Sequence, residues 1–213
     1  MSGASSTPGR DCPLCPRLKA FRDDWRQRQP GWFNAPVPSF GPLTARLLII
    51  GLAPGLKGAN RTGRPFTGDY AGDLLYATLA EFGFTRGSYA ARPDDGLELV
   101  DARIANAVSC VPPENKPTGE EIRTCNQFLA ATINRMPKLV AVVALGRIAH
   151  DAVLLALEAK RAKMPFAHGA VHELGRLTLF DSFHCSPLNT HTGRLTPKMF
   201  HAVFAKARAH LAK

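Results

Sequence analysis

Short apolar runs alternate with helical patterns along most of the chain. The runs that predict buried strands are Leu47 to Gly51, Ala102 to Val108, Leu139 to Leu145 and Leu177 to Phe183. Apolar runs separated by helices favour a parallel sheet that is covered on both faces. We therefore predict an α/β fold, a three-layer α/β/α sandwich with a central, mainly parallel four-stranded sheet.

The helical patterns begin with recognisable signals. The predicted helices are Gly72 to Phe82, Thr118 towards Met136, Arg147 to Glu158, and Thr196 to the C-terminus. Thr118 and Glu121 have the spacing of a capping box, and Pro197 falls in the first turn of the last helix. The small, polar segment 1–10 is predicted to be a disordered tail, and residues 11–213 are predicted to form one domain.

Four segments rich in Gly, Pro, Cys, His and Asn lie at the ends of the predicted strands. In chain order they are GLAPG, NAVSCVPP, ALGR and HCSPLN. Parallel sheets bind ligands beyond the carboxyl ends of their strands. We therefore expect the four segments to converge on one rim, and the functional site to lie there.

The charge balance indicates a class of partner. Lys and Arg outnumber Asp and Glu by 27 to 17. Such a surplus favours a polyanion, because each neutralised phosphate releases counterions, although an ordinary basic enzyme is the alternative. The chain has no apolar run of the roughly 20 residues that cross a membrane and no secretory signal. We expect a cytoplasmic protein without a membrane partner, and a monomer because no heptad or exposed apolar stripe is evident.

The cysteines suggest a metal centre. Cys12 and Cys15 have the C-x2-C spacing that lets two thiolates face one metal, and Cys110 and Cys125 could join them. In an intracellular protein a metal is favoured over disulfides. The spacing leaves zinc, an iron–sulfur cluster and a redox-neutral pair with two unrelated thiols open. Cys185, beside His184, is predicted to be a free thiol.

An ordered set of motifs carries a resemblance to a known family. The motifs are CPLC at 12–15, GLAPG at 51–55, ANRTGRPFTGD at 59–69, CVPPENKPT at 110–118, ALGR at 144–147, HCSPLN at 184–189 and TGRLT at 192–196. Together they resemble the uracil-DNA glycosylase superfamily, specifically its iron–sulfur family 5 branch, over nearly the whole chain after Asp11. The resemblance implies a DNA-repair hydrolase, associated with the nucleoid, that cleaves the N-glycosidic bond of uracil or other deaminated bases. It also implies a structural [4Fe–4S] cluster on Cys12, Cys15, Cys110 and Cys125.

The resemblance implies roles for a catalytic pair and a stacking residue. Phe66 matches the aromatic that stacks on the flipped base, with a core position as the alternative. His184 matches the histidine that contacts the pyrimidine O2. Related branches carry a water-positioning carboxylate where this chain has Leu52 and Ala53, and Asp69 is the expected replacement. The alternative for Asp69 is a helix cap.

Asn106 departs from the small apolar residue that the family 5 branch favours. An amide offers a donor and an acceptor, which fits the N3–O4 edge of uracil and rejects cytosine. We therefore expect a narrower preference for uracil than the branch usually has. Gly51 and Leu52, at the end of the first strand, complete the expected base-binding set.

The expected DNA contacts lie on the loops around this rim. Leu188 matches the leucine that fills the vacated stack, and polar groups beside it could bind phosphates. The expected DNA-binding residues are Asn60, Arg61, Arg64, Asn115, Ser186, Leu188, Asn189, Thr192 and Arg194. The alternative for each is a solvated loop or turn. Two other functions stay open: a catalytically weak protein that binds uracil-DNA, and a cluster- or zinc-bearing nucleic-acid-binding module without chemistry.

Overall fold

One mixed sheet forms the centre of the computed structural model, which describes residues 6–212. Its five strands lie in the order β4 (Ala102–Asn106), β1 (Leu47–Gly51), β5 (Ala141–Leu145), β7 (Leu177–Ser182) and β6 (Val171–Leu174). The first four are parallel, and β6 is antiparallel to β7. The predicted α/β fold is confirmed. The prediction of four strands was one short, because the residues of edge strand β6 are exposed or half-buried and form no apolar run.

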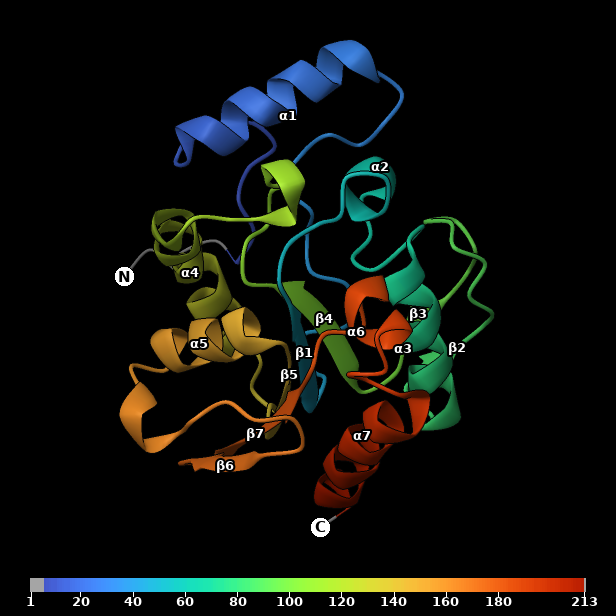
Figure 1. Cartoon of the computed structure of the whole chain (residues 1–213), viewed down its shortest axis with the longest axis vertical. Helices are drawn as coiled ribbons and strands as arrows, with labels where there is room; N and C mark the ends of the chain where they lie inside the picture. Colours follow the sequence, from blue (N-terminus) through green and yellow to red (C-terminus); the bar gives the residue numbers. More distant parts are fainter. Residues whose placement is uncertain (1–5, 213) are drawn as a thin grey trace.

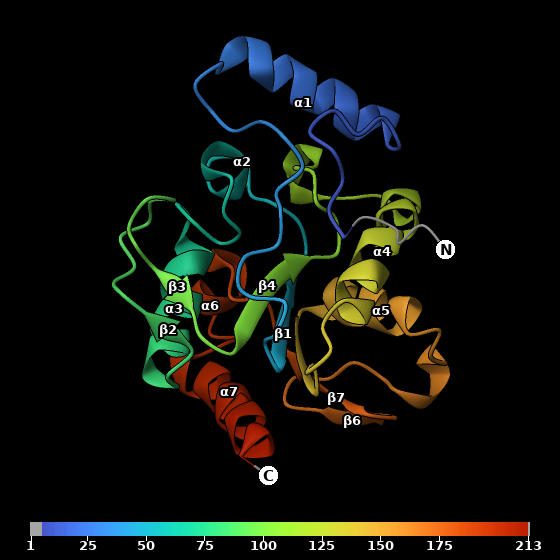
Figure 2. The same cartoon turned by 180° about the vertical axis from the view of Figure 1, so that it is seen from behind.

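Helices cover both faces of this sheet (Figures 1 and 2). On one face lie α4 (Gly119–Asn134) and α5 (Arg147–Ala156), and on the other α3 (Tyr70–Glu81) and α7 (Pro197–Leu211). The alternation of a strand divides its side chains between the two layers. Leu47 and Ile49 join the core with α3 and α7, whereas Leu48 and Ile50 join the core with α4 and α5.

The helix starts follow the capping signals in the sequence. Thr118 Oγ1 accepts the N–H of Glu121 at 3.2 Å, and Glu121 Oε2 accepts the N–H of Thr118 at 2.8 Å, so the predicted capping box is confirmed. The Asp69 side chain caps α3 and the Thr196 side chain caps α7. These caps satisfy backbone N–H groups that have no partner within the helix.

Several elements have no strong apolar pattern and were not predicted. They are α1 (Pro16–Arg28), α2 (Ala59–Thr62), β2 (Thr85–Arg86), β3 (Glu98–Leu99), the short 3-10 turns η1 (Pro113–Asn115) and η2 (Arg161–Lys163), and α6 (Pro187–His191). Helix α1 lies at the end of the molecule far from the C-terminus (Figure 1). Arg22, although charged, is 1% exposed and donates to Cys12 O at 3.1 Å. Arg17 holds the Glu121 carboxylate through Nε at 2.8 Å and Nη2 at 2.7 Å.

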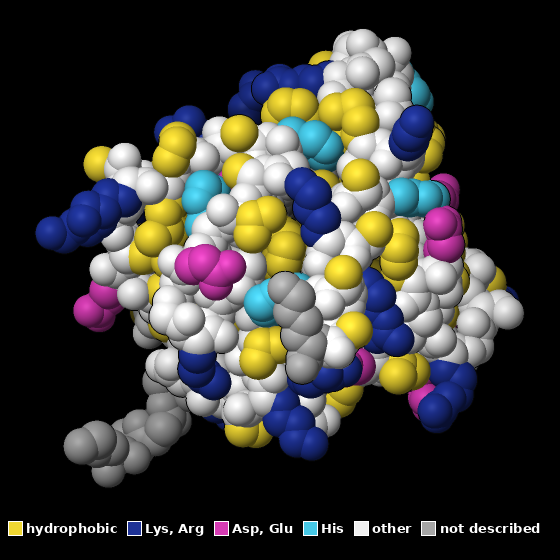
Figure 3. Space-filling view, turned by 90° about the horizontal axis from the view of Figure 1, so that it is seen from below, with side chains coloured by type: hydrophobic (Ala, Val, Ile, Leu, Met, Phe, Trp, Pro, Cys, Tyr) yellow, Lys and Arg dark blue, Asp and Glu magenta, His cyan; other side chains and the backbone are white. Residues whose placement is uncertain are grey.

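The predicted disordered tail falls partly outside the described residues, which begin at Ser6. Ser6 contacts α4: its hydroxyl accepts from Arg135 Nη1 at 2.8 Å and its carbonyl accepts from the Thr132 hydroxyl. Within 6–212 no helix is long and apolar enough to cross a membrane. Figure 3 shows basic side chains scattered over the face seen from below in Figure 1, interrupted by acidic and apolar groups. The positive charge is therefore not gathered into one patch on this face.

Candidate active site

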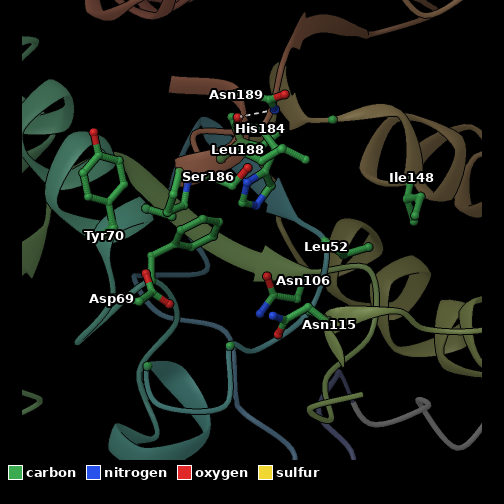
Figure 4. A pocket seen from close by; sticks show the side chains of 18 of the residues that line it. Leu52, Asp69, Tyr70, Asn106, Asn115, Ile148, His184, Ser186, Leu188 and Asn189 are labelled. Atoms are coloured by element: carbon green, nitrogen blue, oxygen red, sulfur yellow. Dashed lines mark hydrogen bonds between the residues drawn. The ribbon is translucent and has the colours of Figure 1, made fainter. Parts of the chain in front are cut away.

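A cavity of about 900 Å³ opens at the carboxyl ends of β1, β4, β5 and β7. Its lining residues from the strand ends and the segments after them are Leu52, Ala53, Gly55, Asn106, Leu145, Gly146, Arg147, His184 and Ser186. The predicted convergence of four segments on one rim is therefore confirmed. Figure 4 shows Asp69 and Asn106 on opposite sides of the open centre of the pocket, with His184 and Leu188 beyond them.

Gly51 lies close to Phe66 and Asn106, and the latter two line the pocket. A β carbon on Gly51 would lie 2.5 Å from Asn106 Oδ1 and 2.6 Å from Phe66 Cζ. Only glycine leaves room for both side chains at this position. The Phe66 ring also stacks near His184, with the ring centroids 5.9 Å apart.

The backbone of Phe66 is strained, and its neighbours hold it in place. Its φ of 52° lies in the left-handed region, which bulky side chains avoid at a cost on the order of 1–3 kcal/mol. The hydroxyl of Tyr89 donates to Phe66 O at 3.2 Å, and that of Tyr76 donates to Pro65 O at 2.7 Å. Strain retained in this way is typical of a functional position, and it fixes the ring against Gly51.

Asp69 caps α3 and faces the pocket at the same time. Its Oδ1 accepts the N–H of Gly72 at 3.1 Å. Its Oδ2 lies against the GLAPG loop, because β carbons on Gly55 and Gly58 would come within 3.0 and 2.2 Å of it. Burial raises the pKa of this carboxyl above its usual value, and the Gly72 N–H partly offsets the rise. Both alternatives for Asp69 therefore fit the geometry, since the cap uses one oxygen and leaves the other.

His184 lines the pocket as a neutral imidazole. Surrounding protein atoms desolvate the ring and lower its pKa to about 4. A neutral ring donates one N–H without carrying a positive charge at neutral pH. Asn189 fixes the backbone here, because its amide donates to His184 O at 2.8 Å (Figure 4).

Asn106 carries an unsatisfied acceptor into the pocket wall. Its Oδ1 is buried and has no hydrogen-bond partner among the described residues. A buried acceptor left in this state costs roughly 1–3 kcal/mol. Asn115, from η1, lines the same pocket with φ of 57°, a conformation that Asn tolerates better than most residues. Both amides are therefore available to a ligand.

The predicted DNA-binding residues divide into two groups. Those that line the cavity are Asn115, Ser186, Leu188, Asn189 and Arg194. Leu188 is 75% exposed, an unusual position for a large apolar side chain. Arg194 lies over the Phe183 ring, 4.5 Å from its centroid. Exposed Arg61 and Thr192 lie outside the lining, and the Thr192 hydroxyl donates to Leu188 O.

Asn60 and Arg64 are corrections to the predicted DNA-binding set. Asn60 is 1% exposed, and its amide donates to Asn34 Oδ1 at 2.8 Å. The Arg64 guanidinium is paired with both carboxylate oxygens of Asp95 at 2.7 Å and is 5% exposed. This pairing holds the pKa of Asp95 well below its usual range. Neither side chain is free to bind a phosphate at the surface.

Three basic residues of the rim were missed. Exposed Lys57, Lys116 and Arg147 line the cavity. Arg147 lies within ALGR, and Lys57 and Lys116 follow GLAPG and NAVSCVPP by two and three residues. Basic residues in or shortly after these segments were therefore the signal. Tyr70, Ile148 and Phe166 also line the cavity, and nothing in their local sequence marks them.

Four of the five cysteines line a second, small cavity, beside Leu18 and Arg22 of α1. They are Cys12, Cys15, Cys110 and Cys125. All are free thiols, and Arg22 Nη1 donates to Cys110 Sγ at 3.5 Å. Among the described residues no three of these sulfurs lie within 4.8 Å of one another. The four cysteines share one cavity and are therefore candidates to hold one metal group.

Comparison with known proteins agrees with this geometry. The family model of the Uracil DNA glycosylase superfamily matches residues 38–208 of this chain. The chain belongs to this superfamily. It is 45% identical over 204 residues to the type-5 uracil-DNA glycosylase of Thermus thermophilus, with 92% of each chain covered.

Other similar proteins include both type-5 and type-4 uracil-DNA glycosylases. The type-5 uracil-DNA glycosylase of Pyrobaculum aerophilum is 40% identical over 204 residues, covering 93% of this chain and 88% of that protein. The type-4 uracil-DNA glycosylase of the same organism is 32% identical over 169 residues, covering 79% of this chain and 71% of that protein. The resemblance drawn from the sequence motifs is therefore confirmed.

Proposed function

We propose that this chain is a hydrolase that removes uracil from DNA by cleaving its N-glycosidic bond, leaving an abasic site. One observation carries the proposal. In a member of the uracil-DNA glycosylase superfamily, a single pocket holds an aromatic ring, an amide, a neutral imidazole and a half-buried carboxylate. The type-5 relatives, at 40–45% identity, bear the name of this activity.

Base recognition uses Phe66 and Asn106. Turning a nucleotide out of the duplex costs a few kcal/mol. Stacking of the flipped base on an aromatic side chain offsets about 1–3 kcal/mol of this cost. The unpaired Oδ1 of Asn106 would accept the uracil N3–H, and its amide N–H would donate to O4. Cytosine presents the opposite pattern on this edge. The amide therefore supports a preference for uracil over cytosine.

His184 acts on the leaving group. When the bond between C1′ and N1 breaks, its electron pair moves onto uracil and negative charge gathers at O2. A neutral imidazole donates its N–H to that oxygen, and such preorganised donors are worth roughly 10²–10³-fold in rate. The lowered pKa leaves the ring neutral at neutral pH.

Asp69 acts on the sugar and on water. Oδ1 stays on the Gly72 N–H, while Oδ2 orients a water molecule towards C1′ and accepts its proton as the new C–O bond forms. The negative charge of the carboxylate also offsets the developing oxocarbenium ion, as in other sugar hydrolases. Atoms balance with free uracil and an abasic deoxyribose as products.

The rim would hold the DNA on both sides of the flipped nucleotide. Leu188 is the exposed apolar side chain that can fill the vacated stack. Ser186, Asn189 and Arg194 lie beside it, and Lys57 and Arg147 line the same cavity from other segments. These donors suit phosphate oxygens. DNA binding of this kind would place the protein at the nucleoid.

We also propose that Cys12, Cys15, Cys110 and Cys125 hold a [4Fe–4S] cluster. The shared cavity and the adjacent Arg22 support this assignment. When bound, the cluster would join the N-terminal segment, the loop after β4 and helix α4. Hydrolysis of a glycosidic bond needs no electron transfer, so its role would be structural.

The test is base release from an oligonucleotide that contains one uracil, followed by alkaline cleavage at abasic sites. We expect cleavage with the wild-type protein, slower cleavage of a hypoxanthine strand, and none with cytosine. His184→Ala should lower the single-turnover rate roughly 10²–10³-fold. His201→Ala, at a half-buried histidine of α7 outside the pocket lining, is the matched control. Tight binding without cleavage would replace the enzyme with a uracil-binding protein.

A further inference from the structure

Two histidines and an aspartate meet on the α5 face of the sheet, away from the proposed chemistry. Asp181, on β7, is fully buried, and His150, on α5, is 1% exposed. His172, from the edge strand β6, completes the group and is 12% exposed in its side chain. Their ligand atoms all lie within 4.8 Å of one another.

The hydrogen bonds of His150 determine what can lie between these groups. Its Nε2 is 3.0 Å from Met164 O, and because a carbonyl only accepts, this nitrogen carries a proton. In the neutral ring Nδ1 then holds a lone pair, and it lies 2.8 Å from Asp181 Oδ1. Either a proton or a metal ion can join the imidazole nitrogen and the carboxylate oxygen at this distance.

The remaining carboxylate oxygen faces the second histidine. Asp181 Oδ2 is 3.1 Å from His172 Nε2. The three residues thus offer two imidazole nitrogens and a carboxylate from three different elements. Imidazole with carboxylate is the donor set that zinc and related divalent transition metals use. A second-shell carbonyl that fixes the tautomer, as Met164 O does here, is the usual companion of a metal-bound histidine.

We propose that His150, His172 and Asp181 form a binding site for one divalent transition metal ion of the zinc type, separate from the cysteine site. Three protein ligands leave a fourth position for water. The ion would join α5, the edge strand β6 and β7 at one point. Strand β6 makes sheet contacts on one side only, so it gains most from this link.

The site also lies behind one wall of the base pocket. The His150 ring contacts Phe166, with the centroids 5.6 Å apart, and Phe166 lines the pocket. Asp181 is three residues before His184 on the same strand and loop. A metal here would stabilise the wall formed by Phe166 and the end of β7 without touching the reacting atoms.

The experiment uses the protein as purified, with whatever group its cysteines carry, and Co²⁺ as the probe. We expect one Co²⁺ per chain with ligand-field absorption of nitrogen and oxygen ligands and no thiolate-to-cobalt charge transfer. His172→Gln, at the sheet edge, should fold, lose this Co²⁺, and lose the rise in melting temperature that Zn²⁺ gives the wild-type protein.

His201→Gln is the matched control, because His201 Nδ1 also lies 3.1 Å from a carboxylate, that of Glu81, but forms no group of three ligands among residues 6–212. It should bind Co²⁺ as the wild type does. Equal Co²⁺ binding by the wild type and His172→Gln would overturn the proposal. Failure of the wild-type protein to bind Co²⁺ would also overturn the proposal, and would mean that a proton joins His150 and Asp181. Base release from uracil-DNA is measured separately, so its presence or absence does not decide this result.

Discussion

The base pocket and the cysteine site are built in different ways. The pocket lies at the ends of four parallel strands whose apolar side chains are almost fully buried in two large cores. The cysteine site rests on a small apolar cluster in which Leu18 and Val108 are the fully buried aliphatic residues. Arginines of α1 supply much of the remaining contact there, through Arg22 and through the Arg17–Glu121 pair.

This difference predicts which changes each region tolerates. The sheet fixes the pocket, so a change in the pocket should alter chemistry and leave stability nearly unchanged. The proposed cluster and a few ion pairs fix the N-terminal segment, so a change there should alter stability and leave chemistry nearly unchanged. The following variants separate the two effects.

The largest expected effect is that of Gly58→Ala. The new β carbon would lie 2.2 Å from Asp69 Oδ2 and would displace the carboxylate. We expect uracil release to slow roughly 10²–10⁴-fold, as for loss of a general base. Single-turnover kinetics measure this. Gly31→Ala, where the added carbon meets nothing within 4 Å, is the control. A normal rate in Gly58→Ala would separate Asp69 from the reaction.

Cys110→Ser tests the other region. We expect loss of iron, a lower melting temperature and rapid proteolysis within 11–34, because Arg22 loses the sulfur that it contacts. The rate of uracil release per folded molecule should stay within about threefold of the wild type, because the pocket is held by the sheet. Cys185→Ser, at a buried thiol outside the cavity, should keep its iron. A loss of activity in fully folded Cys110→Ser would mean that the two regions are coupled.

The pH dependence of His184 gives a smaller effect. Its pKa is about 4 in the folded protein and about 6.5 in the unfolded chain, so the unfolded chain takes up the proton first. The free energy of unfolding should therefore be highest above pH 6.5 and fall as the pH drops from 6.5 through 4. NMR of the imidazole should show His184 neutral at pH 5.5. A titration midpoint near 6.5 would contradict the desolvated ring.

Thr118→Ala should have the smallest effect. It removes the hydroxyl that caps α4, which costs roughly 1 kcal/mol of folding free energy. Helix α4 carries Cys125 and Glu121, so the loss should fall on the cysteine side of the molecule. Chemical denaturation measures the change, and Thr196→Ala, at the cap of α7, provides a comparison of similar size. A changed rate of uracil release in Thr118→Ala would contradict the separation.

The sequence predicted the parts of the fold that depend on local pattern. The run Leu47 to Gly51 gave a strand with the bounds observed, and Thr118 with Glu121 marked the start of α4. Helix α1 could not be predicted in this way, because Arg17 and Arg22 tie it to Glu121 and Cys110, 104 and 88 residues away. Edge strand β6 was missed because it lies at the end of the sheet, beside β7, and its exposed and half-buried residues form no apolar run.

The residues of the candidate site also divide into those that the local sequence predicts and those that depend on distant partners. Residues at or shortly after strand ends, such as Asn106 and His184, were predicted because parallel strands place their ends together. Arg64 was assigned to DNA because nothing in its own segment marks Asp95, 31 residues later, as its partner. Asp69 was expected to position water, with a helix cap as the alternative. In the structure Oδ1 caps α3 and the side chain also lines the pocket.

The most direct test of the account is the single-turnover rate of uracil release by Asp69→Asn. Asparagine caps a helix about as well as aspartate, so α3 and the melting temperature should be unchanged. The variant cannot accept a proton from water, and we expect the rate to fall roughly 10²–10⁴-fold while binding to uracil-DNA persists. A wild-type rate in Asp69→Asn would show that Asp69 only caps the helix, and would contradict the mechanism.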